Sequence, residues 1–395
     1  MIDLAGSELS TRLFLSLRRS DQRRKAQLYL MGLLAAQGRK SMRNISAALD
    51  GADDGATEQS LHHFISSSTW DWRPVRRALV EELTSSWPQH AWVVRALPIS
   101  KAGNLSVGVD RLFVPHLGQS IHGQLAFGLW FVTGRFSVPV SWRLFLPHDW
   151  LRDTERRSRA EIPPTVTPEE LDECAVEAAL ALTDRGGPPR RCPVVLDQVT
   201  GRPGPVAAAF GRAGVPFLAG ITGRTVLSVA DPALPGAGAA ALPAEQILQG
   251  VRGLRRPVPR SDRGFDRGRI SWAAAVPVRV PLGPGDRAAG AEPLHRLSLL
   301  GEWEDLDQPP VRLWLSGVPG MPAGPLLRLA RTVLGVRRDE ETLGRRMGLR
   351  DFEGRSFPGW HRHMTLASVA CAMSATAAEH RARAENRAQQ LSLSA

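Results

Sequence analysis

The chain has 395 residues, of which 43% are hydrophobic, enough for two or three domains with sizeable cores. Its net charge of +11 comes almost wholly from arginine, since Lys25, Lys40 and Lys101 are its only lysines. Such an excess is typical of proteins with a polyanionic partner and favours nucleic acid. A bias towards Ala, Gly, Pro and Arg explains the choice of arginine over lysine, but it does not explain the excess of cations.

Several classes of protein are disfavoured at once. The sequence has no run of about 18 apolar residues, so no membrane span is expected. The first thirty residues lack the ordered regions of a signal peptide, so we expect a cytoplasmic protein. Cys174, Cys192 and Cys371 are far apart and none belongs to a Cys-x-x-Cys pair. The sequence therefore indicates buried free thiols rather than a disulfide framework or a zinc ribbon.

Residues 8–86 predict a helical region. Five stretches carry apolar residues at i, i+3 and i+4 spacing, and Ser41 is placed to cap the third of them. Basic residues cluster early in this region, at Arg18, Arg19, Arg23, Arg24 and Lys25. This cluster is either a solvated helix face or a set of phosphate contacts.

From Ala91 the apolar pattern changes to a period of two. It predicts strands at 91–99, 105–114, 121–132 and 136–146, arranged as an antiparallel meander. A helix is expected over 167–183, beginning near Thr167 with proline at its first position.

An α/β arrangement follows. The apolar strand CPVVLD ends in Asp197, a helix of small residues comes next, and VPFLAGI is a second buried strand. Because α/β sheets place chemistry at the carboxyl ends of their strands, Asp197 is a candidate ligand for a hard divalent cation. The alternative is an ordinary cap or turn residue.

The remaining chain suggests an insertion followed by helices. Residues 223–325 are rich in Pro, Gly and Ala, with short strands and a dense basic stretch at 252–269. Within that stretch, the predicted DNA contacts are Arg252, Arg255, Arg256 and Arg260. Helices are expected at 323–347 and 360–389. The predicted domains are a helical region at 1–88, a core at 89–222, an insertion at 223–325 and closing helices at 326–390.

Familiar enzyme signatures are absent from the sequence, which has no P-loop, G-x-S-x-G or H-E-x-x-H motif. The pair His361 and His363 is a weak metal signal, because residues two apart on a helix point to different faces. The adjacent pair His62 and His63 fails the same test.

A set of motifs resembles one family. The string GLRDFEGRSFPGWHRHMTLASVACAM, from Gly348, is similar to the end of the catalytic domain of bacterial insertion-sequence transposases, the DDE superfamily endonucleases of the insertion-sequence-701 type. Other strings agree in the same order: YLMGLLAAQGRKSMRNIS, LHHFISSSTWDW, SVGV, PVSWRLFLPHDWLRD and VVLDQVTGRPGPVAAAFGRAGVPFLAGI. The resemblance extends over about residues 25 to 380.

The resemblance implies an RNase H-like fold in which three carboxylates hold two metal ions for attack on a phosphodiester. Asp197 matches the second carboxylate. The first belongs to a motif like Trp-Val-Ile-Asp-Asp-Thr-Gly, which here reads WVVRALPISKAG, so Arg95 and Ala96 stand at the two Asp positions. Counting back from Gly348 places Arg337 at the position of the catalytic Glu.

An arginine has no acceptor and would repel a metal ion. We therefore expect Arg95 and Arg337 to pair with Asp197 in the former metal site. Recruited carboxylates are the alternative, and the candidates are Asp110, Asp339, Glu340 and Glu341. Glu353 belongs to the next motif.

The sequence thus predicts an α/β protein with an RNase H-like DDE transposase domain, an inserted β-rich or loop subdomain and a preceding helical domain. The expected function is DNA binding by a transposase-like protein that is catalytically impaired; the alternative is an active, metal-dependent transposase. An impaired protein needs no cofactor, whereas an active one needs Mg²⁺ or Mn²⁺. The expected partners are double-stranded DNA and, by family analogy, a second copy, with nucleoid association and no membrane. Both a decaying remnant and a retained binding protein, such as a repressor of related elements, fit this reading.

Overall fold

The computed structural model describes residues 4–50, 55–114, 118–181, 192–199, 202–238, 241–260, 269–281 and 297–393. The chain consists of two compact units. The first comprises Met1–Pro88, Leu97–Glu169 and Val336–Ala395, and the second comprises Gln89–Ala96 and Glu170–Gly335. Helices occur together with parallel and antiparallel strands, so the mixed α/β class predicted from the sequence is confirmed.

The first unit begins with helices, as the apolar spacing predicts. They are α1 (Leu4–Phe14), α2 (Ser20–Ala35), α3 (Met42–Asp50), α4 (Gly55–Ser66) and α5 (Trp72–Ser86). The hydroxyl of Ser41 accepts the backbone N–H of Asn44 at 3.2 Å, which confirms the predicted cap of the third helix. Asp71 caps α5 in the same way, accepting the backbone N–H of Arg73.

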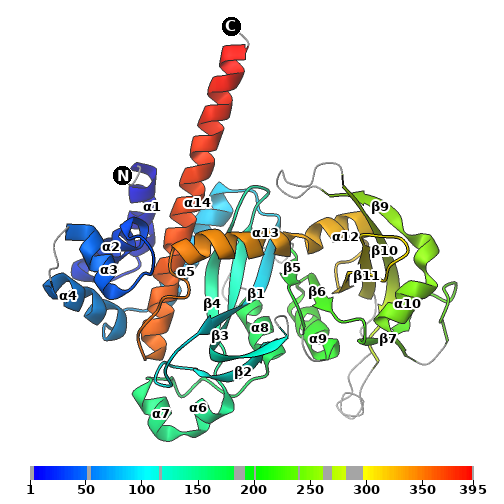
Figure 1. Ribbon diagram of the computed structural model, residues 1–395, viewed down its shortest axis with the longest axis horizontal. Coiled ribbons are helices and arrows are strands. Elements are labelled where there is room, and N and C mark those ends of the chain that lie inside the picture. The colour runs from blue at the N-terminus through cyan, green and yellow to red at the C-terminus, as the bar shows by residue number, and fades with distance from the viewer. Residues whose placement is uncertain are drawn as a thin grey trace. The chain divides into compact units, whose positions relative to one another are not determined.

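The helices α1, α2, α4 and α5 pack against α14 (Phe357–Leu393), which comes from the other end of the chain (Figure 1). Residues 360–373 of α14 are buried at every position, although the stretch includes His361, Arg362 and His363. A helix that is buried all round is the central element of its unit. Beyond Glu379 the described side chains of α14 are mostly exposed, and this end of the helix extends past the elements packed on it (Figure 1).

The strands of the first unit are β2 (Asp110–Val114), β3 (Gln119–Val132) and β4 (Ser137–Leu144), which pair antiparallel in sequence order. The predicted meander is right for these three. It is wrong for β1 (Ala91–Ser100), whose end lies beside β3, with the Lys101 N–H donating to the His122 carbonyl. Gly123 permits this approach, because a Cβ there would collide with the carbonyl of Ile99.

Two short helices follow the strands, α6 (His148–Arg152) and α7 (Thr154–Arg159). The next helix, α8 (Leu171–Leu180), opens the part of the second unit that follows β1. It begins later than the predicted Thr167, because Glu170 and Glu173 form a reciprocal capping box that starts the helix at Leu171.

The second unit contains a parallel set of strands followed by antiparallel ones. The early residues of β1 pair parallel with β5 (Val194–Leu196), which pairs parallel with β6 (Phe217–Ile221). Between β5 and β6 runs α9 (Pro203–Ala213), which starts on proline and ends at the left-handed Gly214.

The antiparallel part of the second unit continues from β6 through β12, β11, β10 and β7 to β8, and β9 pairs with the beginning of β10 on the side that β7 uses further along. These strands are β7 (Val226–Val229), β8 (Leu242–Pro243), β9 (Arg256–Pro259), β10 (Ile270–Arg279), β11 (Leu297–Trp303) and β12 (Arg312–Ser316). The helices of this part are α10 (Ala244–Gly250), a 3₁₀ turn at Arg252–Leu254 and α12 (Ala323–Ala330). The helix α13 (Thr332–Asp339) follows and continues into a π-helix at Glu340–Gly344.

The cysteines are free thiols, with Cys174 and Cys371 buried and Cys192 partly exposed. Among the helices of the described ranges, none combines the length and apolar character needed to cross a bilayer.

Candidate functional site

Two charged residues come together in the second unit where the parallel pairing of β1 with β5 ends, in the middle of β1 and just after β5. Val94 pairs with Leu196 in the parallel register, so the next residues, Arg95 and Asp197, follow at the same edge. The backbone N–H of Asp197 donates to the carbonyl of Val94 at 3.1 Å. The guanidinium of Arg95 forms an ion pair with Oδ2 of Asp197, as expected from the sequence.

This ion pair is largely withdrawn from solvent. The side chain of Arg95 is 6% exposed and that of Asp197 is 27% exposed. The chain after Asp197 is fixed by β6, because the Val199 N–H donates to the Gly220 carbonyl at 2.8 Å. Gly220 must be glycine, since a Cβ would collide with the carbonyl oxygen of Asp197.

The residues at this edge do not fit a divalent metal ion. A guanidinium has no lone pair to offer, and its charge opposes that of the ion. Among the described residues, no three His, Cys, Asp or Glu side chains gather in a way that could hold a metal. This position therefore carries a salt bridge that is largely withdrawn from solvent.

Arg337 lies on α13 within the first unit. Its side chain is 49% exposed and lies 3.9 Å from Glu341, one turn further along. The expected pair between Arg337 and Asp197 would join the two units and stays a prediction.

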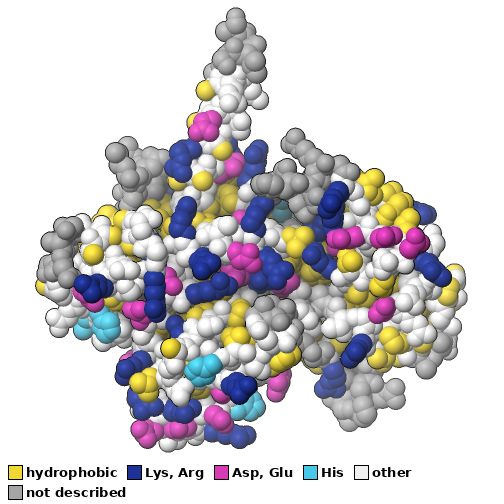
Figure 2. All heavy atoms as spheres, viewed as in Figure 1, with side chains coloured by type: hydrophobic (Ala, Val, Ile, Leu, Met, Phe, Trp, Pro, Cys, Tyr) yellow, Lys and Arg dark blue, Asp and Glu magenta, His cyan; other side chains and the backbone are white. Residues whose placement is uncertain are grey.

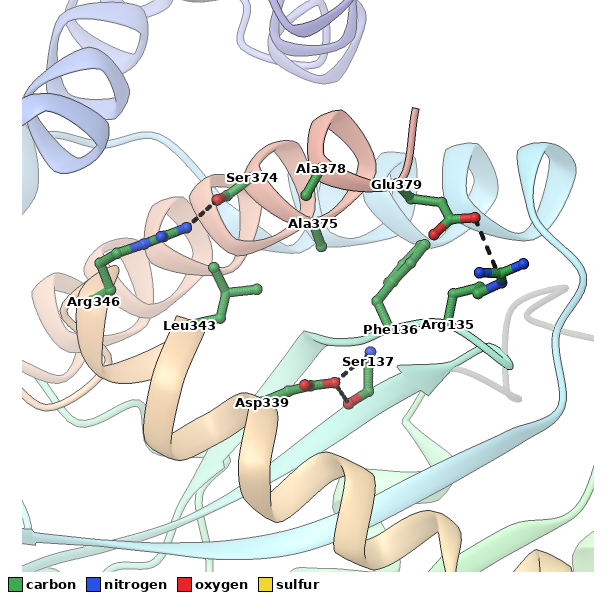
Figure 3. A pocket seen from close by; sticks show the side chains of 10 residues that line it. All are labelled: Arg135, Phe136, Ser137, Asp339, Leu343, Arg346, Ser374, Ala375, Ala378 and Glu379. Carbon is green, nitrogen blue, oxygen red and sulfur yellow. Dashed lines mark hydrogen bonds and ion pairs between the residues drawn. The ribbon is translucent and has the colours of Figure 1, made fainter. Parts of the chain in front are cut away.

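The acidic residues that follow Arg337 have other partners. Asp339 accepts hydrogen bonds from the backbone N–H of Ser137 at 2.8 Å and from its hydroxyl at 2.5 Å (Figure 3). Glu340 is 2% exposed and pairs with Arg350 at 2.6 Å. Neither carboxylate is presented as a ligand, because each is bound within the first unit.

The carboxylates of Asp110 and Glu353 also have partners. Asp110 lies on β2, where its carboxylate accepts the backbone N–H of Arg111 at 2.6 Å. Glu353 pairs with Arg39 at 3.1 Å, in keeping with its assignment to a separate motif.

Figure 3 also shows the pocket into which Asp339 projects, a hollow of about 280 Å³ in the first unit. Arg346 and Ser374 lie at one end, with the guanidinium 2.5 Å from the hydroxyl. Arg135 and Glu379 lie at the other, 3.8 Å apart. The sequence reasoning missed this pocket. Its one sequence signal is the pair of Arg-Arg steps at 337–338 and 345–346, eight residues apart.

The predicted basic cluster at the start of α2 is partly engaged. Arg19 pairs with Asp21 at 2.9 Å, and Arg23 donates to the carbonyl of Leu17, which lies between α1 and α2. Arg18 and Arg24 are exposed, and Lys25 is half-buried. Arg19 is exposed as well but is paired with Asp21, so Arg18 and Arg24 are the better placed of the five for an external anion.

The predicted basic stretch of the second unit is partly satisfied as well. Arg260 pairs with Glu304 and its side chain is 16% exposed. Arg255 donates to the carbonyl of Leu306 at 2.7 Å and covers the ring of Trp303. Arg252 and Arg256 are exposed. Residues 261–268 of this stretch lie outside the described residues.

The His-x-His pair serves packing in the first unit. His363 hydrogen-bonds through Nδ1 to the hydroxyl of Tyr29 and through Nε2 to the carbonyl of Gly348, both at 2.8 Å. His361 stacks on Trp72, with ring centroids 4.8 Å apart. The weak metal signal is thus explained by two buried, hydrogen-bonded rings.

These rings predict acid sensitivity. Burial lowers the pKa of His363 from 6.5 to about 4, and burial together with nearby Arg76 lowers the pKa of His361. The unfolded chain binds protons first as the pH falls, so stability is complete above pH 6.5 and declines below it. We expect His363 alone to lower the free energy of unfolding by about 1.5 kcal/mol between pH 6.5 and 5, and His361 to act in the same direction. Urea titrations across this range measure the slope.

A substitution separates this effect from general acid denaturation. His363→Gln removes one titrating ring, so its profile should be shallower than that of the wild type. The same steepness in both proteins would contradict the assignment.

Comparison with known families agrees with this geometry. The DDE superfamily endonuclease family matches residues 12–244, more than half of the chain and a range that contains both Arg95 and Asp197. No curated protein matches the chain. The mixed sheet and its flanking helices are consistent with an RNase H-like domain. The chain therefore belongs to the DDE superfamily endonucleases and carries a transposase-like DDE domain.

Proposed function

We propose that this protein is a transposase-like DNA-binding protein that has lost phosphodiester cleavage. The observation that carries the proposal is the ion pair of Arg95 with Asp197, where the parallel pairing of β1 with β5 ends. In the family motifs quoted above, acidic residues stand at these positions and hold metal ions. Here the single matching carboxylate is neutralised by a guanidinium.

The chemistry explains why the change matters. DDE endonucleases use divalent metal ions to activate the attacking oxygen and to stabilise the leaving one. With Arg95 and Arg337 at two of the three carboxylate positions, Asp197 alone remains as a ligand. One carboxylate paired with an arginine gives a poor site for a divalent cation.

Binding to double-stranded DNA rests on different observations. The family acts on DNA, the net charge is +11, and exposed arginines lie on α2 and near β9. The same proposal includes four further points. They are membership of the insertion-sequence-701 type, the domain limits at 88, 222 and 325, nucleoid association and a homodimer. The steep salt dependence of phosphate contacts gives the direct measurement: affinity for random duplex should fall strongly as salt rises.

A cleavage assay tests the catalytic part. Purified protein is incubated with supercoiled plasmid and with linear DNA that carries the ends of the element encoding the protein. Each incubation is carried out in Mg²⁺ and in Mn²⁺. We expect no nicking above the background set by the Asp197→Asn variant. Metal-dependent strand breaks in the wild type that Asp197→Asn abolishes would overturn the proposal and would establish the active transposase instead.

That alternative makes its own demand on the structure. An active enzyme would need to recruit acidic residues, and Asp339 and Glu340 would first have to leave Ser137 and Arg350. If cleavage were found, Asp339→Asn and Glu341→Gln would identify which carboxylate takes part.

A further inference from the structure

We propose that the pocket of the first unit is the centre of a surface that binds the phosphodiester backbone of duplex DNA. Four arginines surround it: Arg135, Arg346 and Arg381, which are exposed, and the partly exposed Arg338, which lies 3.9 Å from Asp339. We call this set the arginine rim. The inference rests on the proposed DNA-binding function and gives it a location that differs from the basic clusters on α2 and near β9.

The rim is built from three elements that fold together. Arg135 comes from the turn between β3 and β4, Arg346 from the segment after the π-helix, and Arg381 from α14. Arg381 continues the face of α14 that lines the pocket, because it lies three residues after Ala378 and seven after Ser374. Figure 2 shows Lys and Arg side chains over α13 and around α14 where it leaves the body of its unit.

The acidic groups of the pocket do not cancel this charge at the surface. Asp339 is held by two hydrogen bonds from Ser137, and its side chain is 17% exposed. Glu379 is 9% exposed and is bound by Arg383 at 2.9 Å. By contrast, the side chain of Arg135 is 64% exposed. A ligand approaching from solvent therefore meets guanidinium groups first.

The floor and the spacing of the rim fit a polymer better than a single small anion. Phe136, Leu343, Ala375 and Ala378 give the pocket an apolar floor. Arginines stand at opposite ends of it (Figure 3), so one inorganic phosphate engages only one end. A DNA strand offers both features, with successive phosphates for the two ends and an apolar sugar face between them.

The backbone geometry next to the pocket supports a binding role. Leu343 belongs to the π-helix at Glu340–Gly344. Such single-turn π segments are rare and occur frequently at functional sites. Here the π-helix carries Leu343 to the pocket floor and is followed at once by Arg345 and Arg346.

The experiment compares two variants of the full chain with matched charge. The rim variant combines Arg135→Gln, Arg338→Gln, Arg346→Gln and Arg381→Gln. The control variant removes four exposed arginines from other parts of the same unit: Arg77→Gln, Arg111→Gln, Arg152→Gln and Arg159→Gln. Binding to a 30-base-pair duplex is measured by fluorescence anisotropy at several salt concentrations.

We expect the rim variant to bind on the order of 100-fold more weakly at 0.1 M salt, with a log–log salt slope shallower by about 3. The control should lose far less. Replacing the same four arginines by lysine should retain most of the slope, since the charges remain. Thermal unfolding of each variant confirms folding, because exposed pairs contribute only about 0–1 kcal/mol each.

The outcomes separate this inference from the proposed function. Equal losses in the rim and control variants, with wild-type binding intact, would overturn the rim alone. Absence of duplex binding by the wild type would overturn the proposed function as well. Unchanged DNA binding with a changed sedimentation coefficient in the rim variant would identify a second copy of the chain as the occupant and would also overturn the inference.

Discussion

Replacing Asp197 by alanine is expected to lower the free energy of unfolding by about 2–4 kcal/mol. The change leaves the guanidinium of Arg95 in a site where its side chain is 6% exposed, without the carboxylate that it faces. A buried pair broken on one side costs about 3–5 kcal/mol. We place the effect slightly lower, because the side chain of Asp197 is 27% exposed and water can reach the gap. Urea unfolding followed by tryptophan fluorescence measures the loss.

A double-mutant cycle makes this test specific. Arg95→Met combined with Asp197→Ala removes both charges, so much of the stability lost in the single variant should return. Asp307→Ala in the same unit is the matched control, since Asp307 is exposed. If Asp197→Ala costs no more than Asp307→Ala, the ion pair does not hold this edge of the sheet.

Arg76→Ala is expected to be at least as severe, at about 3–5 kcal/mol. Arg76 is buried in the first unit and donates to Oγ1 of Thr365 at 2.7 Å, to the carbonyl of Trp142 at 2.8 Å and to the carbonyl of His361 at 3.1 Å. These acceptors belong to β4 and α14, so one side chain from α5 connects three elements. Alanine would leave the acceptors unpaired beside a cavity.

The neighbouring residue supplies the control for this prediction. Arg77 lies next to Arg76 on α5 but is exposed, so Arg77→Ala should change stability by no more than about 0.5 kcal/mol. Burial lowers the pKa of Arg76 to about 9, which shows how strongly this site disfavours an uncompensated cation. Similar melting temperatures for the two variants would mean that the hydrogen bonds of Arg76 contribute little.

Much of the local structure could be predicted from the sequence. Apolar runs predicted β1, β5 and β6, and a run of small residues predicted α9 between β5 and β6. These signals are local, so they can be recognised without knowledge of the rest of the chain. The order of strands was harder: β1 lies next to β3 because of a backbone contact at Gly123, which no periodicity reveals.

The candidate site likewise has a part that the sequence predicts and a part that it does not. Arg95 and Asp197 could be placed together because the resemblance puts both at carboxylate positions of one site, and because Asp197 follows an apolar strand of an α/β pattern. The arginine rim could not be found, because Arg135 and Arg346 are distant in sequence and meet only through the packing of α14. The fixed partners of Asp339 and Glu340 depend on the same packing.

The central place of α14 has a consequence for biosynthesis. The helices α1, α2, α4 and α5 leave the ribosome first, yet they pack on a helix of 37 residues at the far end of the chain. At roughly 5–20 residues per second, translation of the intervening chain takes on the order of tens of seconds. During that time the nascent helices expose apolar faces without their partner, and this unit can close only after α14 has been synthesised. A stop codon ahead of Phe357 therefore removes the core of a unit whose first helices have already been made.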